Sequence, residues 1–86
     1  MMLQFTHTIT DPNGIHARPA GLFVKEMQVF KSNVTINREE QSASAKQLIA
    51  LMKMRLKCGQ TFTVIAEGED EAVAIEAAKT FLASNL

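Results

Sequence analysis

The sequence predicts an α+β domain in which a four-stranded antiparallel sheet is covered on one face by three helices. Several short segments alternate apolar and polar residues, a pattern typical of strands that bury one face. Between them lie segments whose apolar residues recur with helical spacing, as in amphipathic helices. A chain of 86 residues is sized for one domain, residues 1–86, and elements with a single apolar face stack in two layers.

The first half of the chain predicts the order strand, helix, strand, strand. Residues 3–10 alternate, with the apolar positions at Leu3, Phe5, His7 and Ile9, and turn residues 11–14 follow. A helix then has its apolar face at Ala17, Ala20, Phe23, Val24, Met27 and Phe30. Val34 and Ile36 mark a second strand, and residues 41–44 predict a weakly patterned third strand across a polar turn.

The second half predicts helix, strand, helix. Residues 45–56 have helical spacing, residues 58–60 break it, and residues 61–66 alternate as a strand. After Gly68, acidic residues 69–71 lie where negative charge favours a helix start. The buried face predicted for this last helix comprises Val73, Ala77 and Phe81, flanked by Ala74, Ala78 and Leu82.

The middle helix carries more apolar residues than one buried face needs. At about 100° per residue, one side comprises Ala45, Leu48, Ile49 and Met52, and the other comprises Ala50, Leu51 and Met54. Only one side can face the sheet, so the other predicts an exposed apolar patch, which often marks a partner interface. Ordinary surface hydrophobes are the alternative, and the clustering favours the interface.

Composition excludes several classes of function. Nine basic and nine acidic residues balance, so no net charge draws the chain to nucleic acid or to an anionic membrane. The single cysteine, Cys58, cannot form an internal disulfide, which fits a reducing compartment. No signal-peptide pattern and no apolar run of membrane-spanning length is present, so we expect a cytoplasmic protein without membrane insertion.

The strongest candidate motif is Gly14-Ile15-His16-Ala17-Arg18-Pro19-Ala20. A histidine here stands at a predicted helix start, where unpaired N–H groups and the positive end of the helix dipole bind phosphate. Imidazole is nucleophilic near neutral pH and releases a phosphoryl group easily, so His16 and Arg18 are the candidate catalytic pair. His16, Ala17 and Arg18 form the candidate phosphate-binding set. By spacing alone, a surface histidine beside a surface arginine is an equally good interpretation.

Other site chemistries have less support. His7 lies mid-strand on the apolar face, which favours a core histidine, and no paired ligand spacing predicts a metal site. The sequence contains no nucleophile-elbow motif and no Gly-rich nucleotide loop. We therefore expect neither a metal nor a cofactor.

The motif and three further segments together resemble HPr, the histidine phosphocarrier family of the bacterial phosphoenolpyruvate:sugar phosphotransferase system. The resemblance covers essentially the whole chain and is carried by residues 14–20, 23–26, 42–46 and 66–71. It implies an open-faced β-sandwich in which His16 accepts a phosphoryl group on Nδ1 from the phosphohistidine of enzyme I. His16 would then pass the group to the IIA domain of a sugar permease, while Arg18 steadies it.

The resemblance also implies how the carrier meets its partners. The implied docking surface comprises Ala17, Ala20, Gly21, Leu48, Ile49 and Met52. Such a protein is a monomer that acts within a relay and has no independent turnover. Two other functions stay open: a regulatory module of the nitrogen-branch type, in which partners read phospho-His16, and a stand-alone enzyme such as a small phosphatase. The shallow surface of so small a domain disfavours the enzyme.

Two positions depart from the family pattern. Gln47 stands where many members carry a regulatory serine, so phosphorylation by an HPr kinase is not expected at that position. Arg55 stands where the family usually has a glycine after the middle helix. A glycine can close a helix in a left-handed conformation, so Arg55 predicts either a different helix end or a longer helix.

Overall fold

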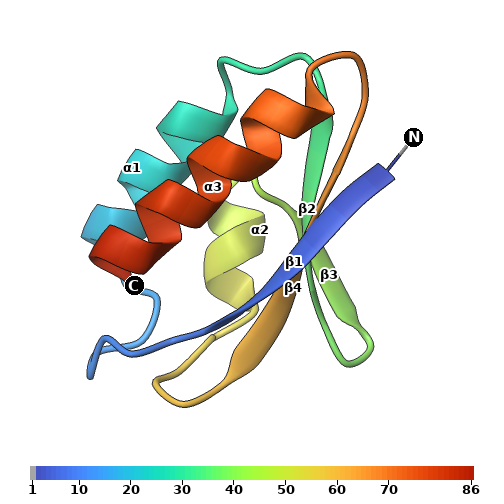
Figure 1. Ribbon diagram of the computed structural model, residues 1–86. Coiled ribbons are helices and arrows are strands. Elements are labelled where there is room, and N and C mark those ends of the chain that lie inside the picture. Colours follow the sequence, from blue (N-terminus) through green and yellow to red (C-terminus); the bar gives the residue numbers. More distant parts are fainter. Residues whose placement is uncertain (1) are drawn as a thin grey trace.

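The computed structural model describes residues 2–86 and has the predicted order of elements (Figure 1). They are β1 (Met2–Thr8), α1 (Ala17–Met27), β2 (Asn33–Arg38), β3 (Gln41–Ser44), α2 (Leu48–Lys53), β4 (Thr61–Glu67) and α3 (Glu71–Asn85). Burial alternates along β1, β2 and β4, because successive side chains of a strand point to opposite faces. The period-two segments of the sequence are therefore confirmed as strands.

The strands form one antiparallel sheet in the order β1-β4-β2-β3. β1 pairs with β4 along its whole length, from Met2 opposite Glu67 to Thr8 opposite Thr61. β2 pairs with β4 on one side and with β3 on the other, where Arg38 lies opposite Gln41 beside the hairpin turn. The predicted α+β class, with four antiparallel strands and three helices, is confirmed.

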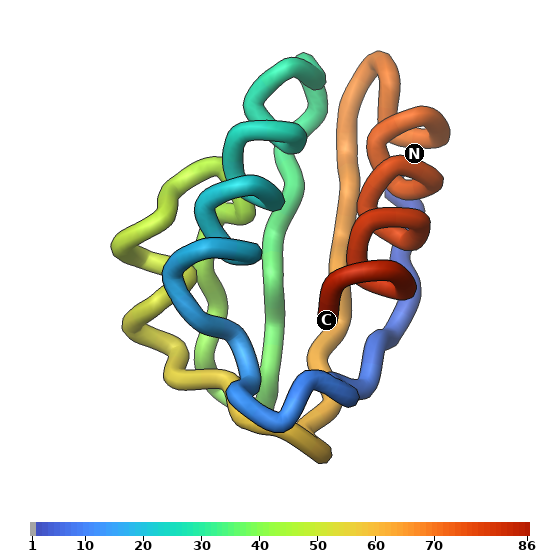
Figure 2. The backbone as a smooth tube through the Cα atoms, turned by 90° about the vertical axis from the view of Figure 1, so that its left-hand side faces the viewer, coloured from blue at the N-terminus to red at the C-terminus, as the bar shows by residue number. Residues whose placement is uncertain are grey.

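All three helices lie on the same face of the sheet, and α1 lies between α2 and α3 (Figure 2). The core forms between the layers. Its largest buried side chains include Phe23 and Met27 of α1, Ile36 and Phe62 of the sheet, and Leu51 and Leu82 of the other helices. Because the helices cover only one face, the sandwich is open on the other, as predicted.

Helix α2 is shorter than the spacing predicts, covering Leu48–Lys53 rather than residues 45–56. Ala45 and Leu56 are buried in the segments that flank the helix, so their apolar character reflects the core and not the helical period. The helix ends as Arg55 adopts a φ of 52°, a left-handed conformation that costs a non-glycine residue about 1–2 kcal/mol. The prediction that Arg55 alters or extends the helix end is therefore wrong.

Helix α3 buries most of the face predicted for it, with one exception. Val73 is 61% exposed, whereas the buried residues are Ala74, Ile75, Ala78 and Leu82. The helix packs on β1 and β4, where the small alanine side chains allow a close approach. Of the predicted face, Ala74, Ala78 and Leu82 are confirmed as buried, Ala77 and Phe81 pack partly buried against the core, and only Val73 is wrong.

A carboxylate at the start of α3 fastens the loop between α1 and β2. Asp70 accepts hydrogen bonds from the backbone N–H groups of Lys31 and Ser32, each at 2.9 Å, and from the Ser32 hydroxyl. These bonds, above all the one from the Ser32 hydroxyl, lower the pKa of Asp70 to about 2. Within the acidic run at 69–71, Asp70 therefore also anchors the loop that contains Lys31 and Ser32.

Candidate functional site

His16 is the N-cap residue of α1, at the junction between the loop after β1 and the helix. Its backbone is extended, and its carbonyl accepts the first hydrogen bond of the helix from the Ala20 N–H group at 3.0 Å. The N–H groups of Ala17 and Arg18 have no acceptor within the helix, and Pro19 has no N–H group. The helix start therefore presents free donors and the positive end of its dipole to an anion beside the His16 ring.

The loop before His16 packs closely on the segment after α2. The Ile15 N–H group donates to the Leu56 carbonyl at 3.0 Å. Gly14 has a φ of 66°, and a Cβ atom there would lie 2.5 Å from the Leu56 oxygen and 2.8 Å from the Lys57 Cα atom. Only glycine fits this contact without displacement. Gly14 therefore allows the loop before His16 to lie directly against the segment after α2.

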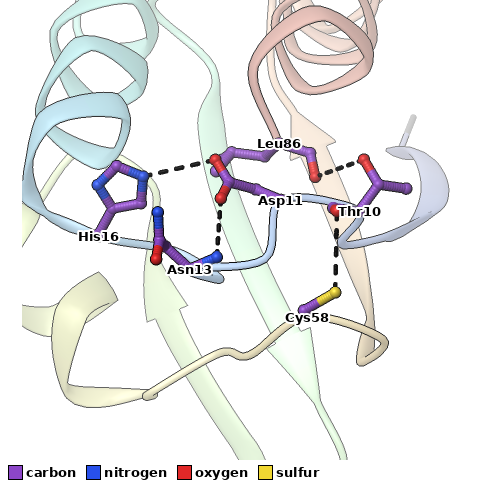
Figure 3. Close-up of polar contacts among 6 residues, drawn as sticks. All are labelled: Thr10, Asp11, Asn13, His16, Cys58 and Leu86. Carbon is purple, nitrogen blue, oxygen red and sulfur yellow. Dashed lines mark hydrogen bonds and ion pairs between the residues drawn. The ribbon is translucent and has the colours of Figure 1, made fainter.

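The Nε2 atom of the His16 ring faces a carboxylate. His16 Nε2 lies 3.5 Å from Asp11 Oδ2, and the His16 side chain remains 42% exposed (Figure 3). Asp11 belongs to the turn that follows β1, and sequence reasoning identified it only as a turn residue. The available signal was an acidic side chain in the turn that leads directly to the histidine.

Arg18 adds a positive charge next to His16 at the start of α1. It is the second residue of α1 and is exposed. Among residues 2–86, no carboxylate forms an ion pair with its guanidinium group. The guanidinium is therefore available to contact phosphoryl oxygens at the helix start, through several donors in a fixed geometry.

The apolar patch predicted on the middle helix is exposed. Leu48 is 38% and Ile49 is 72% exposed, and Met52 is half-buried, while Leu51 and Met54 point into the core. The two faces of α2 are thus divided as the sequence predicts, except that Ala45 precedes the helix and is buried. We call the exposed part of α2, formed by Leu48, Ile49 and Met52, the α2 patch.

The neighbouring surface of α1 extends the α2 patch toward His16. Ala17 is exposed, and a Cβ atom added at Gly21 would meet nothing within 4 Å. The end of α1 is tied to the segment before α2, because the side chain of the C-cap residue Gln28 donates to the Lys46 carbonyl at 3.0 Å. Ala20 does not belong to this surface, because it is 0% exposed and packs in the core. Its assignment as a docking residue is therefore wrong.

The remaining candidates take no part in the site. The His7 ring packs on Phe62, and its buried Nε2 atom has no hydrogen-bond partner in the described chain. Cys58 is exposed, with its Sγ atom 3.8 Å from the Thr10 carbonyl. Within residues 2–86 there is no cluster of three acidic, histidine or cysteine side chains that could hold a metal ion. No helix in the described part of the chain is both long and apolar enough to span a membrane.

Known proteins of one family match this chain in sequence. The family described as "PTS HPr component phosphorylation site" matches residues 3–84. Phosphocarrier protein HPr of Lysinibacillus sphaericus is 44% identical over 75 residues, which cover 87% of this chain and 85% of that protein. The HPr of Buchnera aphidicola subsp. Baizongia pistaciae is 43% identical over 81 residues, which cover 94% of this chain and 95% of that protein. An HPr-like protein, Crh of Halalkalibacterium halodurans, is 41% identical, covering 80% and 82%.

Solved structures agree with this match. The histidine-containing phosphocarrier protein of a mycoplasma superposes with a TM-score of 0.92 at 38% identity, covering 95% of this chain and 93% of that one. HPr of Thermoanaerobacter tengcongensis gives a TM-score of 0.90 at 32% identity, covering 95% and 92%. The chain therefore belongs to the HPr family, the phosphocarriers of the phosphotransferase system.

Proposed function

We propose that His16 is the residue that carries the phosphoryl group and that it does so on Nδ1. The supporting observation is the position of the ring at the start of α1, with Nε2 turned to Asp11 and the side chain 42% exposed. The nitrogen that does not face Asp11 is the one available as a nucleophile. Imidazole binds and releases a phosphoryl group readily, as a carrier requires.

Three groups around His16 stabilise the transferred phosphoryl group. The N–H groups of Ala17 and Arg18 are unpaired within the helix, and the Arg18 guanidinium has no ion-pair partner among residues 2–86. Phosphoryl transfer depends mainly on positioning and on charge stabilisation. These groups supply both without a metal or cofactor of the chain's own.

The partners proposed for this relay are enzyme I as donor and the IIA domains of sugar permeases as acceptors. They dock on Ala17, Gly21 and the α2 patch, an apolar surface that adjoins the helix start. Exposed Arg55 and Lys57 follow α2 and border the loop of His16, so an acidic rim on the partner fits this side. The chain works as a cytoplasmic monomer, and turnover belongs to the relay and not to the chain alone.

A regulatory role is the second candidate function. The similarity to Crh of Bacillus subtilis supports it, because that protein is described as the catabolite repression HPr and is 34% identical over 93% of this chain. In this role a partner protein reads the phosphorylated state of His16 without receiving the group.

Gln47, exposed just before α2, has no hydroxyl to phosphorylate. Incubation with an HPr kinase and ATP therefore leaves the chain without phosphoserine, and stoichiometric phosphoserine would contradict this.

Intact-mass spectrometry tests the proposal. The chain is mixed with phosphoenolpyruvate, Mg²⁺ and enzyme I, and its mass is measured before and after brief acid treatment. One acid-labile phosphoryl group on the wild type, and none on His16→Ala, is expected. Absence of the group from the wild type would refute the carrier function. Addition of separate IIA domains then distinguishes the carrier, which loses the group to them, from the regulator, which keeps it.

A further inference from the structure

The turn after β1 fixes the Asp11 carboxylate in one orientation. Asp11 Oδ1 accepts a hydrogen bond from the Asn13 N–H group at 2.8 Å, and the Asp11 carbonyl accepts one from Gly14 at 2.9 Å. The Asp11 N–H group lies 3.2 Å from the Leu86 oxygen. With Oδ1 occupied by the turn, Oδ2 is the oxygen that faces His16 Nε2 (Figure 3). The carboxylate is thus oriented without help from a partner protein.

We propose that Asp11 is a positioning residue that keeps the His16 proton on Nε2 and so leaves the Nδ1 lone pair free to attack phosphorus. The inference rests on the function proposed for His16. A neutral imidazole carries one N–H group and one lone pair, and a carboxylate can only accept a hydrogen bond. The 3.5 Å separation of Nε2 and Oδ2 is long for a hydrogen bond. It shortens as positive charge develops on the ring during transfer.

Phosphoryl transfer to His16 requires no proton to leave the imidazole ring. The Nδ1 lone pair forms a bond to phosphorus while the bond between phosphorus and the donor's nitrogen breaks, and that nitrogen keeps the electron pair. The imidazole becomes a cation that retains its Nε2–H group, and the Asp11 carboxylate lies 3.5 Å from the Nε2 atom that shares the positive charge. When the group passes to an acceptor, the Nδ1–phosphorus bond breaks and the ring is neutral again. The Asp11 carboxylate therefore stabilises the charged ring both when His16 accepts the phosphoryl group and when it passes the group on.

The substitution Asp11→Asn separates the proposed effect of Asp11 on the His16 tautomer from its part in holding the turn after β1. Asparagine keeps an amide oxygen to accept the Asn13 N–H group, so the turn is retained. Its NH₂ group then faces His16 Nε2, and a donor at that position favours the tautomer with the proton on Nδ1. That tautomer has no lone pair at the proposed nucleophile. The matched control is Glu40→Gln, which removes the same charge from the exposed turn between β2 and β3.

The experiment compares the wild type, Asp11→Asn and Glu40→Gln in two measurements. Nitrogen-15 NMR of the His16 ring reports which nitrogen carries the proton. Phosphorylation by phosphoramidate, a small donor that needs no docking surface, gives the rate of attack. Asp11→Asn is expected to move the proton toward Nδ1 and to slow the reaction about five- to tenfold, the effect of one charge at this distance near the surface. Glu40→Gln is expected to match the wild type.

Two results would overturn the inference. One is an Asp11→Asn protein with the wild-type tautomer and rate. The other is a wild-type ring that carries its proton on Nδ1, a measurement that does not depend on the folding of any variant. If enzyme I fails to phosphorylate the wild type, the proposed function is refuted instead, and the tautomer measurements still decide the role of Asp11.

Discussion

Gly21 offers a substitution with opposite expected effects on stability and on docking. It lies in the interior of α1, and a Cβ atom added there meets nothing within 4 Å. Glycine in a helix interior costs about 0.8–1.0 kcal/mol relative to alanine. With no clash to offset this gain, Gly21→Ala is expected to raise the free energy of unfolding by about 1 kcal/mol. For a domain of this size, that raises Tm by about 4–8 °C.

The same open space is where a partner is proposed to approach. Gly21→Gln has nearly the helix propensity of alanine, so its stability is expected to stay at or above that of the wild type. Its long side chain projects from the docking surface and is expected to slow phosphoryl transfer from enzyme I. Phosphorylation by phosphoramidate, which needs no docking, should not change. Val73→Gln, an exposed change on α3, is the control for a bulky polar side chain away from this surface.

Thermal unfolding and transfer kinetics on these three variants check the reasoning. Loss of stability in Gly21→Ala would show that the position is packed and would refute the structural premise. Transfer from enzyme I at the wild-type rate in Gly21→Gln would refute the proposed docking surface, whatever the stability result.

Three further substitutions have defined outcomes. Arg55→Gly removes the cost of a left-handed arginine but adds freedom to the unfolded chain, so urea unfolding should show a net gain of about 0.5–1 kcal/mol, and a loss would contradict this. Asp70→Asn should be less stable than the wild type at neutral pH. The folded pKa of Asp70, about 2, lies below its unfolded value. The greater stability of the wild type is therefore complete above about pH 5 and disappears as the pH falls to about 2. A stability difference between the two proteins that does not change with pH would contradict the role of the hydrogen-bonded carboxylate. Ile49→Gln, at a 72% exposed position, should change stability by less than about 0.5 kcal/mol yet slow transfer from enzyme I, and a large loss of stability would show that Ile49 belongs to the core.

The sequence predicts the strands well because their signal is local. The alternation along β1, β2 and β4 follows directly from burial on one face, and even the weakly patterned β3 lies at residues 41–44 as expected. Helix limits depend on tertiary structure and were less predictable. Ala45 and Leu56 are apolar because loops also enter the core, and the left-handed Arg55 ends α2 although its residue type does not favour that conformation.

The candidate site was predictable in part. His16 at the helix start and the division of α2 into two faces follow from turn and helix patterns. The contact between Asp11 and His16 was not predictable, because it depends on how the turn folds back toward the ring. The hydrogen bonds that Asp70 accepts from Lys31 and Ser32 join segments distant in the chain and have no local signal. Ala20 was assigned to the docking surface from its family position, although the helical spacing already placed it on the apolar face that the structure buries.

In the proposed carrier, the phosphoryl group resides on Nδ1 of His16. Phosphorus-31 and nitrogen-15 NMR of the chain phosphorylated by enzyme I tests it directly, since coupling between phosphorus and a ring nitrogen identifies the bonded atom. We expect coupling to His16 Nδ1, with Nε2 still carrying its proton beside Asp11. Coupling to His16 Nε2, or to a nitrogen of His7, would contradict it.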